Sequence, residues 1–371
     1  MNRRVMAEQL EEHLRNVNVY FDREGEFPKG RGPLKTYLIE AHGPDGDELN
    51  HQTVIDALSN AADAASLHLQ GTDDRTLFQL TDGDVGFFLD VLDPRFWVVH
   101  TMSNVDKCEQ LLDRLTDSYP NLDYAWPPSE LMRALQKSGK PAGFAVDFDE
   151  TQFLPASESR LIDEPNAVVK FHFGGTRAET WLSELERFAP DALAFSMVKF
   201  SLQDQEGKSY LIAELNERGR LKGAGNSISL YLATVAQFLH QYRSLIAKIE
   251  SFGRLRSQGK GDGGLLIGDP LVFEFPKPVR DFRSFVKELV SCREPLKIWG
   301  VVEEVRGDFV QIEAVDLHTA SRLRLDATPH FMRIYLGPTA CGNTVARILR
   351  NIQGHVDSTV SLSIPAEEAA V

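Results

Sequence analysis

The chain has few of the features that mark secreted or membrane-spanning proteins. Its three cysteines, Cys108, Cys292 and Cys341, lie far apart and form no Cys-x-x-Cys pair, so neither a disulfide framework nor a zinc cluster is expected. No apolar run approaches the length that crosses a bilayer, and the amino terminus lacks the apolar stretch of a secretory signal. These absences predict a cytoplasmic protein in a reducing compartment, without a membrane partner.

Common catalytic motifs are also missing. Gly253 and Gly259-Lys260 resemble a phosphate-binding loop, but five residues separate the two glycines where four are required. The chain has no Gly-x-Ser-x-Gly or His-Glu-x-x-His pattern, and its ten histidines are scattered. The leading expectation is therefore a protein with no cofactor.

Charge is distributed unevenly along the 371 residues. The net charge is −14, of which residues 1–164 carry −15 and residues 165–371 carry +1. An acidic half can meet a basic partner or repel nucleic acid, and it can equally serve solubility alone. With 42% hydrophobic and 25% charged residues, the composition is typical of a globular protein long enough for two or three domains.

The sequence does contain a recurring pattern: an apolar strand, an amphipathic helix, three or more strands and a second amphipathic helix. The pattern is clearest near the carboxyl end, where hydrophobic periodicity and turn residues mark each element. The predicted elements there are a strand at 271–275, a helix at 279–289, strands at 298–305, 309–315, 322–325 and 331–336, and a helix around 345–352.

Two earlier segments repeat this order. The middle one has a strand at 168–173, a helix at 181–188, strands at 194–202 and 209–215, and a long helix over 235–249. The first, which is fainter, has a strand at 36–41, a helix at 54–65, strands at 76–80, 85–92 and 96–102, and a helix from Asn104.

This order predicts the α+β fold class, built from tandem units. It resembles the order of elements in TATA-binding-protein-like domains, and the resemblance implies a curved antiparallel sheet that presents one face to a ligand while helices cover the other. The copies begin near residues 35, 168 and 271 and share no residue signature. Convergent patterning is therefore the alternative to a true repeat.

The pattern divides the chain into six segments. They are an amino-terminal helix and lead-in at 1–34, an acidic α+β unit at 35–120, a connecting segment with a short helix and a strand at 121–166, a second unit at 167–252, a glycine-rich basic linker at 253–268, and a third unit at 269–371.

Basic residues gather around the linker. Arg254, Arg256, Lys260, Lys277 and Arg280 lie in or just after a glycine-rich stretch, and flexibility with positive charge suits contact with the phosphates of nucleic acid. A solvated connection between two domains needs the same residues, and this is the alternative.

Two further arginines belong to the predicted nucleic-acid-binding set. Arg322 and Arg324 alternate with leucines, which places both on one side of a strand. With Arg333 they are candidates to contact phosphate or an acidic protein. They can equally keep a sheet edge soluble.

One acidic segment carries a possible chemistry. An apolar strand leads into Asp147-Phe-Asp149-Glu150-Thr151, and a strand that ends in Asp-x-Asp-x-Thr resembles the first motif of haloacid-dehalogenase-type phosphotransferases. The resemblance implies Asp147 as nucleophile, Asp149 as acid and base, and Mg²⁺ beside them. Asp147, Asp149 and Glu150 are the candidate metal ligands of this reading. A solvated surface strand is the alternative.

The sequence therefore favours a non-catalytic binding or assembly protein. We expect it to be a subunit of a complex with other proteins that contacts nucleic acid through the basic linker. The alternative is a metal-dependent phosphoryl-transfer enzyme or nucleic-acid hydrolase that uses Asp147 and Asp149.

Overall fold

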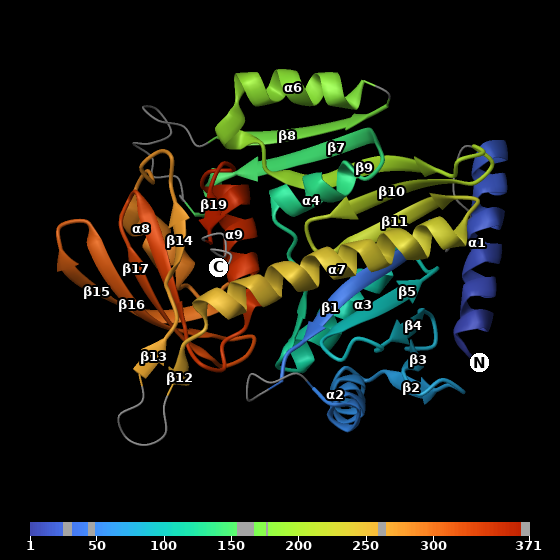
Figure 1. Cartoon of the computed structure of the whole chain (residues 1–371), viewed down its shortest axis with the longest axis horizontal. Helices are drawn as coiled ribbons and strands as arrows, with labels where there is room; N and C mark the ends of the chain where they lie inside the picture. The colour runs from blue at the N-terminus through green and yellow to red at the C-terminus, as the bar shows by residue number, and fades with distance from the viewer. Residues whose placement is uncertain (25–31, 44–48, 154–166, 176, 259–264, 365–371) are drawn as a thin grey trace, which may run out of the picture.

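The computed structural model describes residues 1–24, 32–43, 49–153, 167–175, 177–258 and 265–364 (Figure 1). Within these residues the chain forms eight α-helices and two large antiparallel sheets, of 11 and six strands. The α+β class predicted from the sequence is therefore confirmed. None of the described helices is long and apolar enough to cross a membrane, and the three cysteines are free thiols.

The first sheet has the strand order β2-β3-β4-β5-β1-β11-β10-β9-β7-β8, and β6 also pairs with β1. Its strands are β1 (Leu34–Ala41), β2 (His68–Gly71), β3 (Leu77–Thr81), β4 (Gly86–Asp90), β5 (Phe96–Thr101), β6 (Leu122–Tyr124), β7 (Lys140–Asp149), β8 (Val168–Gly174), β9 (Phe195–Gln203), β10 (Tyr210–Asn216) and β11 (Arg220–Gly225). β1 joins the two halves of this sheet, because Ile39 faces Trp97 of β5 on one side and Tyr37 faces Arg220 of β11 on the other.

Helices cover both faces at the middle of the first sheet. The long α7 (Ile228–Gly253) crosses the sheet and packs on β10 and on α1 (Arg3–Glu24) (Figure 1). α2 (His51–Ala64) packs on α3 (Val105–Ser118), which contacts β6. Every residue of β1 and β5 is buried, so neither strand offers an open face to a ligand.

Two shorter helices, α4 (Ser129–Gln136) and α6 (Ala178–Phe188), pack on β9 and β7. The short helix and the strand predicted within 121–166 are therefore α4 and β7. The strand is an interior member of the sheet, because it lies between β8 and β9.

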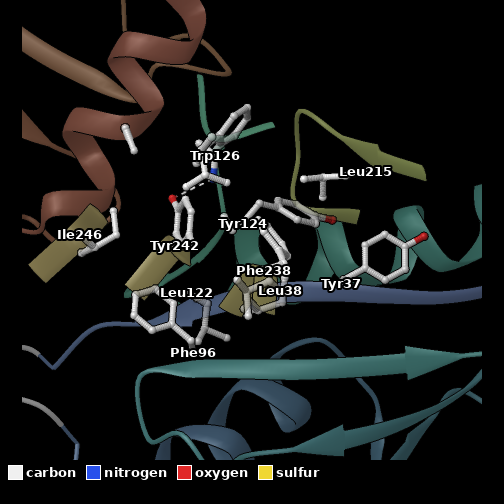
Figure 2. Packing of buried hydrophobic residues seen from close by; sticks show 14 of the residues in the cluster. Tyr37, Leu38, Phe96, Leu122, Tyr124, Trp126, Leu215, Phe238, Tyr242 and Ile246 are labelled. Carbon is white, nitrogen blue, oxygen red and sulfur yellow. Dashed lines mark hydrogen bonds between the residues drawn. The ribbon is translucent and has the colours of Figure 1, made fainter. Parts of the chain in front are cut away.

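Large side chains fill the space between β1 and α7 (Figure 2). Phe96 and Tyr242 meet edge to face with their ring centroids 5.7 Å apart, an arrangement that aromatic pairs prefer. The hydroxyl of Tyr242 accepts a hydrogen bond from the backbone nitrogen of Trp126 at 2.8 Å, so the polar end of this buried ring is satisfied. The regular three- and four-residue spacing of apolar side chains that predicts α7 is the spacing that builds this core.

The second sheet has the order β15-β16-β17-β18-β14-β19. Its strands are β14 (Leu271–Glu274), β15 (Ile298–Arg306), β16 (Phe309–Asp316), β17 (Arg322–Ala327), β18 (Phe331–Leu336) and β19 (Ser361–Ser363), and its helices are α8 (Phe282–Leu289) and α9 (Gly342–His355). Buried side chains alternate with more exposed ones along β16 and β18. One face of this sheet therefore belongs to the core and the other does not.

The predicted linker at 253–268 contains a small hairpin. β12 (Arg256–Gln258) pairs antiparallel with β13 (Leu265–Ile267). Lys260 lies outside the described residues.

The first and last units arrange their strands alike. In each, four strands follow the first helix and the last of them, β5 or β18, lies beside the first strand, β1 or β14. In the middle unit the first strand, β8, pairs instead with β7 at the edge of the sheet. The shared order of two units does not by itself establish a repeat.

Candidate functional site

A cleft of about 550 Å³ lies where the first sheet meets α9 and the loop at 294–297. Its walls come from α3, β6, β7, β8, the turn between β10 and β11, and the end of α9. Four lysines or arginines line it against seven carboxylates, so the cleft is acidic. The carboxylates are Asp113, Asp117, Asp123, Asp147, Asp149, Glu217 and Glu294.

The basic side chains of the cleft are paired with its carboxylates. The pairs are Arg218 with Asp113 at 2.6 Å, Lys297 with Asp117 at 3.2 Å, Lys170 with Asp147 at 3.5 Å, and Arg350 with Glu217. Because each of these cations already has a carboxylate neighbour, surplus negative charge is what a ligand meets in the cleft.

The acidic motif of the sequence contributes two of these side chains. Asp147 and Asp149 lie two positions apart on β7 and both line the cleft. Asp149 accepts hydrogen bonds from the backbone nitrogen and hydroxyl of Thr151 at 2.9 and 2.5 Å. Burial raises the pKa of Asp149, but the bonds from Thr151 outweigh it and leave that pKa below its ordinary value. Asp149 is therefore available as a carboxylate.

Glu150, the third member of the acidic motif, is absent from the cleft lining. Its side chain pairs with Arg280 at 2.5 Å and accepts a bond from the backbone nitrogen of Ala167 at 2.7 Å. β7 also runs antiparallel to both of its neighbours, whereas α/β enzymes place their sites at a shared row of parallel strand ends.

The basic residues predicted around the linker differ in their surroundings. Arg254 donates to the carbonyl of Ala340 at 3.1 Å and lies 3.0 Å from Glu250, so it fastens the end of α7 to the segment before α9. Arg256 is exposed on β12, and Lys260 lies outside the described part of the chain. Lys277 pairs with Asp191, as Arg280 does with Glu150.

Arg322 and Arg324 lie together on the exposed side of the second sheet, which we name the open face. Side chains from four adjacent strands make up the open face. They are Trp299, Val301, Glu303, Gln311, Glu313, Val315, Arg322, Arg324, Phe331, Arg333 and Tyr335.

Arginines and aromatic rings are neighbours on the open face. The guanidinium of Arg324 lies 5.9 Å from the ring centroid of Tyr335, and that of Arg333 lies 4.8 Å from that of Phe331. Arg324 Nε is also 3.4 Å from a carboxylate oxygen of Asp326. The face therefore mixes both charges with aromatic surface.

β15 forms the outer edge of the second sheet. It pairs with β16 along one side, and among the described residues its other side has only a single bridge, between Ser291 and Trp299. Trp299, Val301 and Val305 are 50%, 59% and 49% exposed. This is an edge strand with large apolar side chains in water, which natural sheets usually avoid.

Sequence reasoning found the strand at 298–305 but not its exposure. Valines and a tryptophan in a short run predict a strand equally well at an edge or in a core. Only the position of β15 at the end of the strand order separates the two cases.

The family comparison covers the whole sequence. Residues 1–371 match a family model described as MJECL33-like protein. The chain is also 27% identical over 332 residues to the uncharacterized protein MJECL33 of Methanocaldococcus jannaschii, and that alignment covers 79% of each chain.

Proposed function

This chain belongs to the MJECL33-like protein family, and we propose that it is a non-catalytic binding protein that works as a subunit of a protein complex. Its interface is the outer edge of β15 with the adjoining part of the open face. One observation carries the proposal: Trp299, Val301 and Val305 are about half exposed on a strand whose outer side has one described bridge. Clustered apolar side chains in water mark interaction sites.

The proposed occupant is a segment of a partner protein that adds to β15 as a further strand. Main-chain hydrogen bonds to a free sheet edge supply affinity, and alternate side chains supply specificity. Glu303 follows Val301 on the same side of β15, and Glu313 faces Val301 from β16. A segment in which apolar residues alternate with lysine or arginine therefore complements this edge in both hydrophobicity and charge.

The topology of the units and the cellular location of the protein are also part of the proposal. The shared strand order of the first and last units supports a TATA-binding-protein-like arrangement of these two, with the middle unit as a departure. Because β1 and β5 are buried on both faces, the binding face is that of the last unit. We place the protein in the cytoplasm, where the exposed thiol of Cys292 stays reduced.

Two labelled peptides of equal length test the interface. In one, lysine alternates with valine and tryptophan; in the other, glutamate replaces each lysine. We expect the basic peptide to bind the full chain in a salt-sensitive manner and to slow hydrogen exchange of β15 amides. The double variant Trp299→Lys/Val301→Lys should weaken this binding by about 10-fold or more, since it removes the apolar anchors and adds like charge.

Phe188→Lys is the matched control, because Phe188 is 88% exposed on α6, which packs on the first sheet. Equal binding of the two peptides, or full binding by the double variant, would contradict the proposal. Labelled RNA and DNA form a further arm. Salt-sensitive binding that is lost in Arg322→Gln/Arg324→Gln would assign the open face to nucleic acid instead.

A second candidate function is a metal-dependent phosphoryl-transfer enzyme or nucleic-acid hydrolase. The observation that favours it is the placement of Asp147 and Asp149 on one side of β7, inside the cleft. Carboxylate oxygens are the ligands that Mg²⁺ prefers, and Lys170 beside Asp147 can meet a phosphate.

The two functions separate in one assay. If the cleft is catalytic, turnover of p-nitrophenyl phosphate or cleavage of labelled nucleic acid requires Mg²⁺ or Mn²⁺. Turnover then falls by about 100-fold or more in Asp147→Asn, because the nucleophile is lost. A far-UV circular dichroism spectrum like that of the parent chain shows that the variant is folded. If Asp147→Asn leaves metal-dependent turnover unchanged, the chemistry takes place elsewhere in the chain. If the parent chain shows no turnover with any metal, this candidate function is removed.

A further inference from the structure

Outside the cleft and the open face, a buried group of glutamate, histidine and cysteine side chains joins the first unit to the last. Glu40 is the last residue but one of β1, and His42 directly follows the strand. His318 lies in the turn after β16, and Cys341 precedes α9. All four residues are buried, with exposed fractions of 0%, 3%, 4% and 0%. Segments about three hundred residues apart therefore bring four potential ligands together at one site that is buried from solvent.

Three of these side chains are already close. One donor atom from each of Glu40, His42 and Cys341 lies within 4.8 Å of the other two. The sulfur of Cys341 is 3.0 and 3.2 Å from the carboxylate oxygens of Glu40. Ligand atoms around a tetrahedral zinc ion are about 3.5 Å apart, given metal–ligand bonds of about 2.0–2.3 Å.

His318 supplies an independent observation that points to a ligand. Its side chain is 2% exposed, and its Nε2 lies 3.6 Å from Oε2 of Glu40. Beyond this ion-pair contact, the nitrogen has no hydrogen-bond partner among the described residues. A buried polar atom without a partner costs free energy, and coordination of a metal would satisfy it.

Hydrogen bonds with neighbouring groups orient the side chains of His42 and Glu40. Nε2 of His42 donates to the carbonyl of Thr339 at 3.1 Å, which fixes the tautomer of the neutral ring and makes Nδ1 the nitrogen that can coordinate a metal. Arg95 Nε and Nη2 donate to Oε1 of Glu40 at 2.9 and 2.7 Å. Those bonds hold the carboxylate while Oε2 stays directed at His318.

Cys341 is placed to carry a thiolate when a metal is present. It is the N-cap of α9, and its sulfur accepts a bond from the backbone nitrogen of Asn343 at 3.3 Å. The amino end of a helix stabilises negative charge.

We propose that Glu40, His42, His318 and Cys341 form a binding site for one divalent transition-metal ion of the zinc class. Thiolate, imidazole and carboxylate are the ligand types that zinc takes in proteins, and four of them match its preferred number. Binding would release the thiol proton of Cys341 to solvent. The ion and Arg95 would together bring three positive charges to the Cys341 thiolate and to the carboxylates of Glu40 and Glu250, which Arg95 contacts. The site would fasten the end of β1 to the start of α9.

The competing account of this cluster is a metal-free ion network. Burial lowers the pKa of His318, but Cys341 and Glu40 outweigh it and raise that pKa to about 10. Burial and Glu40 raise the pKa of Cys341 to about 12. Without metal, His318 is then an imidazolium beside Glu40, and Cys341 is a neutral thiol. Thiolate spectroscopy separates the two accounts.

The experiment uses the full chain carrying Cys292→Ser, so that an exposed thiol does not bind metal adventitiously. We expect Co²⁺ to bind with one ion per chain and to give a thiolate-to-cobalt charge-transfer band. That band should vanish in Cys341→Ser and persist in Cys108→Ser, a matched control at a second buried thiol. Zn²⁺ should raise the melting temperature of the parent chain.

His318→Gln keeps the test decisive if Cys341→Ser fails to fold. This variant should bind Zn²⁺ more than about 100-fold more weakly than the parent chain, since losing a ligand exceeds the effect of about 10–100-fold from losing a supporting contact. A band that survives Cys341→Ser overturns the proposal. So does a melting temperature of the parent chain that is equal in Zn²⁺ and in chelator.

Discussion

Replacing Arg347 with methionine is expected to lower the free energy of unfolding by about 3–5 kcal/mol, because it breaks two buried ion pairs at once. Arg347 of α9 is fully buried, and its guanidinium contacts Asp123 of β6 and, at 2.5 Å, Asp316 of β16. Its Nε donates to the carbonyl of Leu296 at 3.1 Å. Both carboxylates would lose this cation while remaining in the interior. Urea titration followed by far-UV circular dichroism measures the change.

Arg4→Met is the control for Arg347→Met, because Arg4 and Glu8 form an exposed pair with side chains 87% and 58% accessible. Its effect should stay within about 0.5 kcal/mol. A triple variant that also carries Asp123→Asn and Asp316→Asn should recover much of the loss, since no uncompensated charge is left inside. If Arg347→Met costs no more than Arg4→Met, these pairs do not hold α9 to the rest of the chain.

The last unit shows how far local patterns reach. Its predicted strands and helices coincide with β14 to β18, α8 and α9 to within a few residues. Each of these elements depends on side-chain periodicity and on turn residues close in sequence, such as Gly307 at φ 60° between β15 and β16. Periodicity of this kind is present in the sequence itself.

Strand order and buried charge lay beyond those patterns. The insertion of β7 between β8 and β9 depends on pairings between segments distant in sequence, and an apolar run around Phe144 looks the same at an edge or in the interior. Arg347 and Glu40 are charged residues, which sequence reasoning assigns to the solvent-exposed surface. They are buried because partners from other segments meet them there.

The candidate site divides in the same way. Asp147 and Asp149 stand out in the sequence because two carboxylates follow an apolar strand, and the structure places both in the cleft. Their neighbours Asp113, Glu217 and Arg350 come from three other elements, and no local motif joins them. The charge balance of the cleft, which decides what can bind there, is therefore a property of tertiary structure alone.

Lys35, like Arg347, is a charged residue in the interior. Unlike Arg347, it has no compensating carboxylate among the described residues. Its Nζ donates to the carbonyl of Pro33 at 2.6 Å, and the residue is 0% exposed. Lys222 lies directly opposite it on β11, where like charges destabilise a sheet. Burial, with a smaller contribution from Lys222 and Arg220, lowers the pKa of Lys35 to about 8.

Lys35→Met is therefore expected to raise the free energy of unfolding by about 1–2 kcal/mol near neutral pH. A fall in the pKa from 10.5 to about 8 corresponds to a cost of about 3 kcal/mol for the charged form, and the lost bond to Pro33 offsets part of the gain. Below about pH 8, Lys35 is protonated in both states and this cost is complete. Between about pH 8 and 10.5 the unfolded chain binds more protons than the folded one, so the stability of the parent chain rises with pH and the advantage of methionine shrinks.

Urea titrations at about pH 7 and pH 10 measure that change in advantage between Lys35→Met and the parent chain. Lys248→Met, at an exposed position of α7, is the control and should change stability little at either pH, because a solvated lysine has similar surroundings in both states. A gain from Lys35→Met that is equal at the two pH values would show that Lys35 keeps its proton in the folded chain throughout this range. The benefit of methionine would then come from packing alone, and the buried charge would carry no cost that pH can remove.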